Sequence, residues 1–275
     1  MIKKECFTTE WIEQVSSELH YNDKNLIEKV IRALSLLEML VKAGCPLVFK
    51  GGTALMLILG KSAHRLSIDI DVICPPGTNI EDYLKSFADF GFINLELVER
   101  KQRDDADIPK SHSKFFYQIA YRNDTDAQSY ILLDVLYEDI HYFQTRQIAI
   151  DCPFIRLEGE PLMVTVPSAE DILGDKLTAF APNTTGIPYY KNGRSCSMEI
   201  AKQLYDVGRL FENVSGLQIT SEAFRKIALV ELSYRSLGTD IGQVFNDIRQ
   251  TALCISTRGK AGEGDFDLIQ DGIIR

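Results

Sequence analysis

The chain has 275 residues, which is enough for one large domain or two smaller ones. Hydrophobic residues make up 45% and charged residues 25%, which excludes disorder, collagen and coiled coil as descriptions of the whole chain. The formal net charge of −9 argues against a protein that coats nucleic acid by bulk charge, although a local basic patch can still hold an RNA end.

Apolar residues recur at three- and four-residue spacing from about residue 22 to 43, which predicts a helix that Gly44 ends. A short strand is expected at 47–49, a buried helix at 53–59, and a strand of period two at 66–73. The pattern then predicts a helix at 80–90 and strands at 93–100, 115–122, 130–137, 146–151 and 161–166.

The pattern changes after Pro167, where helices are expected at 168–180, 196–213, 220–236 and 240–256, with a loop at 182–193. We therefore predict an α+β protein with an α/β domain over residues 1–166 and a helical domain over residues 167–275.

The cysteine pattern and the hydropathy indicate the cellular compartment of the protein. Six cysteines form no CxxC pair, which argues against a zinc knuckle, and scattered thiols suit a reducing cytosol. The N-terminal residues lack the apolar run of a signal peptide, and the longest aliphatic run, at 54–59, is too short to cross a membrane. We expect a cytoplasmic protein with no membrane partner.

Two aspartates separated by one residue, Asp69 and Asp71, interrupt the strand expected at 66–73. Residues i and i+2 of a strand share a face, so the two carboxylates repel each other unless a cation lies between them. Oxygen ligands suit Mg²⁺ or Mn²⁺. An Asp-x-Asp pattern alone is common, so a plain surface pair remains the alternative.

A Gly-Gly-Thr run, Gly51 to Thr53, lies between an expected strand and an expected helix. The glycines would let the backbone approach a phosphate, and the helix N-terminus offers free N–H donors. An ordinary turn is the alternative. Asp134 lies in a strongly apolar strand, where a carboxylate is costly to bury without a partner, so it is a third metal-ligand candidate or a salt-bridge residue.

The run FKGGTAL (49–55) followed by RLSIDIDV (65–72) resembles the AbiEii/AbiGii group of toxin nucleotidyltransferases, which belong to the polymerase-β-like superfamily. The resemblance continues in EDILGDKLTAF (170–180) and KQLYDVGRL (202–210). It implies a mixed sheet flanked by helices, followed by an α-helical C-terminal domain. In the run EDILGDKLTAF, Gly174 stands where an alanine is expected.

The resemblance also implies roles for single residues. Asp69 and Asp71 would hold Mg²⁺ or Mn²⁺ on the triphosphate of an NTP, with Asp134 as the third carboxylate. Lys176, from the helical domain, would neutralise the triphosphate, although it could be a surface lysine. The remaining candidates for nucleotide or phosphate contact are Gly51, Gly52, Thr53, Arg65, Ser67 and Asp206. For Asp206 the alternative is that it merely orients Lys176 or an adjacent helix.

The expected function is a Mg²⁺-dependent nucleotidyltransferase that moves a nucleoside monophosphate from an NTP to an acceptor hydroxyl. By the resemblance it would be the toxin of a toxin–antitoxin or abortive-infection system, with tRNA or another RNA as acceptor and a cognate antitoxin as partner. A small-molecule nucleotidyltransferase and a catalytically silent nucleotide-binding module are the alternatives. A basic run interleaved with aspartates is typical of a solvated loop, with an RNA patch as the alternative; it comprises Arg100, Lys101, Arg103, Lys110 and Lys114.

Overall fold

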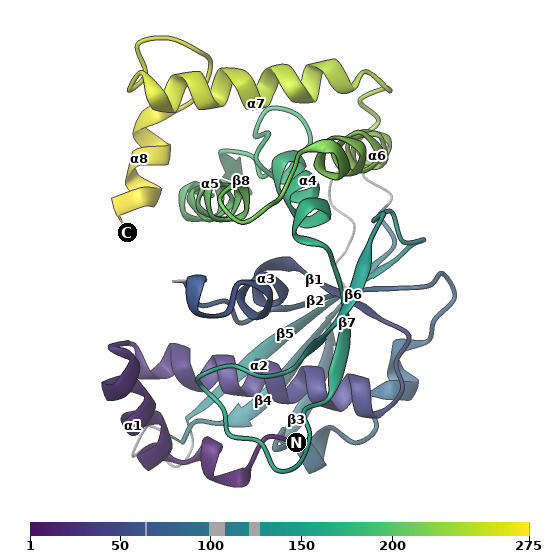
Figure 1. Cartoon of the computed structure of the whole chain (residues 1–275), viewed down its shortest axis with the longest axis vertical. Helices are drawn as coiled ribbons and strands as arrows, with labels where there is room; N and C mark the ends of the chain where they lie inside the picture. Colours follow the sequence, from purple (N-terminus) through teal and green to yellow (C-terminus); the bar gives the residue numbers. More distant parts are fainter. Residues whose placement is uncertain (64, 99–107, 121–126, 275) are drawn as a thin grey trace. The chain divides into compact units, whose positions relative to one another are not determined.

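The computed structural model describes residues 1–63, 65–98, 108–120 and 127–274 (Figure 1). Its described residues form two compact units. Unit 1 comprises the described residues of 1–98 and 109–140 together with Thr145–Pro167, and unit 2 comprises Ile108, His141–Gln144 and residues 168–274. That the two units are domains divided at residue 166 stays a prediction. Within the described chain, no helix combines the length and apolar character that a membrane crossing requires.

Unit 1 begins with helices and continues with a mixed sheet. Its helical elements are η1 (Lys4–Phe7), α1 (Thr9–Leu19), α2 (Lys24–Lys42), α3 (Gly51–Leu59), η2 (Gly60–Ser62), η3 (Ile80–Tyr83) and η4 (Phe87–Phe90). Its strands are β1 (Val48–Lys50), β2 (Ile70–Cys74), β3 (Asn94–Val98), β4 (Lys110–Gln118), β5 (Gln128–Tyr137), β6 (Thr145–Ala149) and β7 (Met163–Pro167).

Five strands form the main sheet in the order β1-β2-β5-β4-β3. The pair β2–β5 is parallel, and the pairs β1–β2, β4–β5 and β3–β4 are antiparallel. A separate antiparallel pair joins β6 to β7. The mixed sheet with its helices confirms the α+β class that the sequence predicted.

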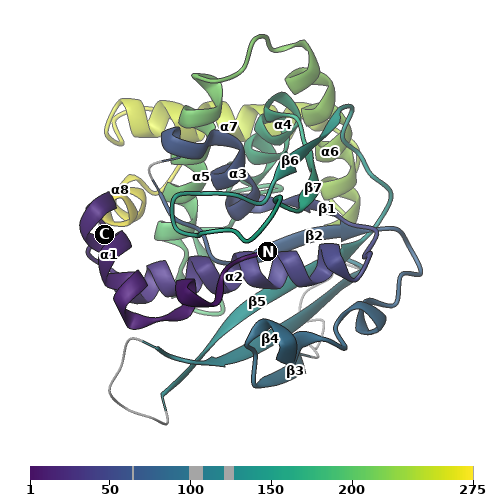
Figure 2. The same cartoon turned by 60° about the horizontal axis from the view of Figure 1, so that its bottom comes forward.

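Helix α2 packs on β2 and β5, as Figure 2 shows from below. The Asp23 side chain caps its first turn by accepting the N–H of Leu26, and Gly44 follows its end in the left-handed region at φ 76°. The side of the sheet that faces the hydrophobic core, here called the core face, presents fully buried apolar residues, among them Phe49, Ile70, Val72, Leu133 and Val135.

Unit 2 is helical apart from a short hairpin. Its helices are α4 (Ala169–Ala179), α5 (Ser197–Phe211), α6 (Gln218–Tyr234), α7 (Ile241–Ser256) and α8 (Phe266–Ile274), and the hairpin is β8 (Tyr190–Lys191) with β9 (Arg194–Ser195). Ser168 caps α4 by accepting the N–H of Asp171. The buried Asp171 carboxylate in turn accepts the N–H groups of Phe143 and Gln144, so the start of α4 is fixed to the segment 141–144.

Gly174 lies where α4 approaches α6 closely. A Cβ at this position would lie 2.8 Å from both Cβ of Ala223 and the backbone nitrogen of Phe224 in α6. The low helix propensity of glycine is therefore offset by an approach of the two helices that an alanine would prevent.

Some sequence predictions differ from the structure. Residues 80–90 form two 3₁₀ turns, η3 and η4, in place of one helix. Leu84 and Phe90 are both buried but are six residues apart, so one α-helical face could not bury both. The strand predicted at 66–73 begins at Ile70. The ends of the strands predicted at 93–100 and 115–122, and Arg100, Lys101 and Arg103 of the basic run, lie outside the described residues, whereas Lys110 and Lys114 lie on β4.

Candidate active site

A row of charged and polar residues crosses the main sheet in register. Lys50 of β1 is opposite Asp71 of β2, Asp71 is opposite Asp134 of β5, and Asp134 is opposite His112 of β4. Directly opposed residues project from the same side of a sheet. These four residues therefore share one side, here called the carboxylate face, which is the reverse of the core face.

Residues of β5 alternate between the two sides of the sheet. Ile131, Leu133 and Val135 are buried in the core, whereas the side chain of Asp134 is 34% exposed on the opposite side. Asp134 also lies on the strand beside that of Asp71. Asp69 is exposed and lies one residue before the start of β2.

The glycines at the start of α3 lie against the side chains of the second motif. Gly51 has φ 77°, and a Cβ there would lie 2.1 Å from Oδ2 of Asp71. A Cβ on Gly52 would lie 2.6 Å from Oγ of Ser67 and 2.9 Å from Nη2 of Arg65. Both glycines are therefore needed for the close approach of these three side chains to the helix N-terminus, whose first N–H groups have no partner inside the helix.

Thr53 has a role that the sequence did not reveal. Its side chain is buried, and its hydroxyl donates a 2.7 Å hydrogen bond to the backbone carbonyl of Asp69. The hydroxyl thus ties α3 to the chain just before β2, and the backbone N–H is the group that Thr53 can offer to a phosphate.

His112 is a candidate that sequence reasoning missed. Its Nδ1 lies 2.5 Å from Oδ1 of Asp134, and its side chain is only 8% exposed. The contact depends on the register of β4 against β5, and a lone histidine in a strand carries no local signal of such a partner.

The donor set suits a divalent cation of the Mg²⁺ type. Asp71 and Asp134 occupy directly opposed positions on neighbouring strands, and their carboxylates are hard oxygen ligands. Among the described residues no group of three or more Asp, Glu, His and Cys side chains is gathered as a metal cage. Mg²⁺ is typically held by one or two carboxylates together with substrate phosphates, so a pair of aspartates fits this ion.

Lys176 in unit 2 forms a buried ion pair with Asp206. Its Nζ lies 2.9 Å from Oδ2 of Asp206 and donates to Oε1 of Gln203 at 3.1 Å. The side chains of Lys176 and Asp206 are 11% and 2% exposed, respectively. The pair connects α4 to α5 and fixes the ammonium group, while the role of Lys176 toward a nucleotide stays a prediction.

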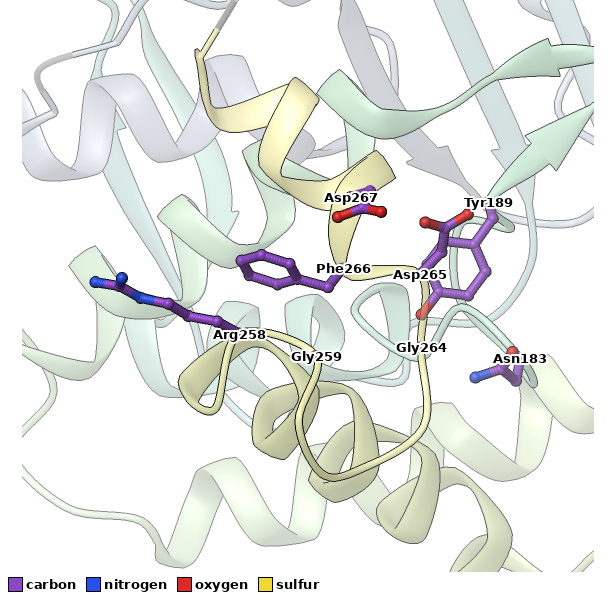
Figure 3. Close-up of a pocket in the computed structure, with 8 residues that line it drawn as sticks. All are labelled: Asn183, Tyr189, Arg258, Gly259, Gly264, Asp265, Phe266 and Asp267. Atoms are coloured by element: carbon purple, nitrogen blue, oxygen red, sulfur yellow. The ribbon is translucent and has the colours of Figure 1, made fainter.

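Unit 2 also contains an open pocket of about 700 Å³ near the start of α8 (Figure 3). Residues that line it include Asn183, Tyr189, Arg258, Asp265, Phe266 and Asp267. Asp265 accepts the N–H of Leu268 and so caps α8. None of the residues that the sequence proposed for chemistry lines this pocket.

The family model described as the nucleotidyl transferase AbiEii toxin, type IV toxin–antitoxin system, matches residues 33–270. A search of curated proteins found no match.

Among solved structures, JHP933 from Helicobacter pylori is 17% identical with a TM-score of 0.40, over 94% of this chain and 95% of that chain. MenT4, a nucleotidyltransferase toxin from Mycobacterium tuberculosis H37Rv, is 15% identical with a TM-score of 0.44, over 92% of this chain and 74% of that chain. Because the family model spans most of the sequence and includes every candidate site residue, the chain belongs to the AbiEii nucleotidyltransferase toxin family.

Proposed function

We propose that this nucleotidyltransferase moves a nucleoside monophosphate from an NTP to an acceptor hydroxyl, with Mg²⁺ or Mn²⁺ held by Asp69, Asp71 and Asp134. The observation that carries the proposal is the opposed pair Asp71 and Asp134 beside the N-terminus of α3. A cation site and a phosphate site that share one carboxylate are what a metal-bound triphosphate requires.

Each residue of the site has a separate task in this proposal. When bound, the cation would supply neutralising charge for the triphosphate. The backbone N–H groups of Gly51, Gly52 and Thr53 would bind the leaving phosphates, with Arg65 and Ser67 beside them. Asp134 would take the proton of the attacking hydroxyl, and Lys176, oriented by Asp206, would add positive charge from unit 2.

We further propose an RNA acceptor, with tRNA as the first candidate. Tyr130 lies on β5 four residues before Asp134, about 13 Å along the same face, and is 41% exposed. Its ring centroid is 5.7 Å from that of Phe116, and Nζ of Lys114 lies 5.3 Å from the Tyr130 ring. Aromatic rings beside lysines favour stacking of unpaired bases near their phosphates.

Family membership supports a toxin with a cognate antitoxin, and an NTP substrate is consistent with action in the cytoplasm. The test is incubation of the pure protein with each labelled NTP, Mg²⁺ and total tRNA. We expect label on RNA with wild type and none with Asp69→Asn. Label on a small molecule only, at normal rate, would contradict the RNA acceptor, and equal labelling by Asp69→Asn would contradict the site.

The acceptor surface has its own test. Tyr130→Ala should raise the KM for RNA and leave the KM for NTP unchanged, because the ring lies away from the carboxylates. Phe245→Ala, which removes another exposed aromatic residue, is the control and should change neither constant. Expression alone should slow bacterial growth with wild type and not with Asp69→Asn.

A further inference from the structure

We propose that His112 is a positioning residue that holds Asp134 in the orientation in which this carboxylate binds the cation. The inference rests on the proposed function and adds His112 to the residues around its three carboxylates. It starts from the contact between Nδ1 of His112 and Oδ1 of Asp134 at 2.5 Å.

The donor and the acceptor of this contact follow from their chemistry. An ionised carboxylate can only accept, so Nδ1 of His112 must carry the proton and donate it. The hydrogen bond engages one lone pair of Oδ1 and leaves the other lone pairs of the carboxylate for the cation and for the proton of the attacking hydroxyl. A ligating carboxylate held in this way loses its freedom to rotate before the cation arrives, which is the usual effect of a hydrogen bond on a metal ligand.

His112 and Asp134 differ in burial, which indicates different roles for the two side chains. The His112 side chain is 8% exposed and packed within the sheet, whereas the Asp134 side chain is 34% exposed and accessible to a substrate. A buried ring has few orientations, so it is a rigid support for a mobile carboxylate. Since His112 touches no other carboxylate of the proposed site in the described contacts, its action passes through Asp134.

A purely structural role is the competing interpretation. However, β4 and β5 are already paired in register along all of Lys110–Gln118, so the strands do not depend on this side-chain contact for their alignment. The contact also places a polar ring opposite a carboxylate between Leu132 and Leu136, at a position where an apolar partner would serve packing better.

The test compares His112→Phe, which keeps the ring but removes the donor, with His112→Asn, whose side-chain amide can donate from near the position of Nδ1. Mn²⁺ binding is measured by electron paramagnetic resonance with a non-hydrolysable NTP analogue, and kcat and KM are measured separately. We expect His112→Phe to weaken Mn²⁺ binding by about 10- to 100-fold and to lower kcat more than it raises KM. His112→Asn should restore both within about threefold, with thermal unfolding temperatures near wild type. If His112→Phe does not fold, His112→Val takes its place with the same expectation.

The outcomes separate this inference from the proposed function. Wild-type Mn²⁺ affinity and kcat in His112→Phe would overturn the role of His112 and leave the proposed function intact. Equal losses in His112→Phe and His112→Asn, in step with their unfolding temperatures, would also overturn it. If wild type with the NTP analogue binds no Mn²⁺, or Asp71→Asn binds it equally well, the proposed function itself fails.

Discussion

Along β2 and β5, alternate residues meet two different environments. Ile70, Val72, Leu133 and Val135 lie on the core face and are buried beneath α2, whereas Asp71 and Asp134 lie on the carboxylate face and remain partly exposed. Because the side-chain period of a strand is two, adjacent residues project from opposite sides of the sheet, so that one packs in the core and the next lies on the carboxylate face. The rigid core face can therefore support carboxylates whose mutual repulsion would distort a less anchored strand.

The adjacent residues Leu133 and Asp134 give the sharpest test of this contrast. Leu133→Ala removes a fully buried side chain from the core face and should lower the free energy of unfolding by about 2–5 kcal/mol. Chemical denaturation measures this loss. Activity per folded molecule should stay near wild type at low temperature, and a selective loss of kcat without loss of stability would contradict the division of the two faces.

Asp134→Asn changes the neighbouring residue on the carboxylate face. The amide oxygen can still accept from His112, so stability should change by less than about 0.5 kcal/mol. Loss of the negative ligand should lower kcat by at least about 100-fold while nucleotide binding falls less. Steady-state kinetics and nucleotide titration measure the two effects. A variant with full turnover would exclude Asp134 from the chemistry.

Gly51→Ala tests the edge at which the sheet meets α3. The left-handed backbone should cost about 1–2 kcal/mol of stability, and the new Cβ would displace the Asp71 carboxylate, so activity should fall as well. Gly44→Ala is a matched control, since Gly44 has φ 76° and no atom within 4 Å of an added Cβ. The control should lose similar stability and keep its activity, and equal activity in both variants would contradict the contact with Asp71.

The smallest expected effect concerns Glu38, a carboxylate buried in α2. Burial raises the pKa of Glu38, and the N–H of Ile2 that it accepts only partly opposes the rise. A raised folded-state pKa contributes stability that is present below the unfolded value and is lost as pH rises through the folded value. Glu38→Gln should therefore gain stability relative to wild type as pH rises above about 4.5. Unfolding measured from pH 4 to 8 checks the trend, which a less stable variant at pH 7 would contradict.

Much of the fold followed from local patterns in the sequence. The spacing of apolar residues located α2, and the apolar run around Asp134 located β5. Glycines at a helix start and paired aspartates leave a signal within a few positions, so these residues could be named as candidates, and their roles stay predictions.

The parts that could not be predicted depend on contacts between distant segments. His112 meets Asp134 through strand register, and the Thr53 hydroxyl is engaged by a carbonyl sixteen residues away. Glycine has a low helix propensity, and its place at position 174 is explained only by the close approach of α6. Each of these depends on packing between segments, which the residue pattern within one segment cannot reveal.

The parallel pairing of β2 with β5 has a consequence for how the enzyme becomes active. Asp71 and Asp134 are opposed in space but 63 positions apart in the chain, with β3 and β4 between them. Closing so long a loop costs conformational entropy before any contact rewards it, so such pairings form slowly and late. A chain still emerging from the ribosome, with β5 not yet made, carries the Gly-Gly and Asp-x-Asp motifs but not their third carboxylate. By the proposed function, activity of this toxin family member would therefore begin only after β2 and β5 have paired, which would delay its chemistry until synthesis of this region is complete.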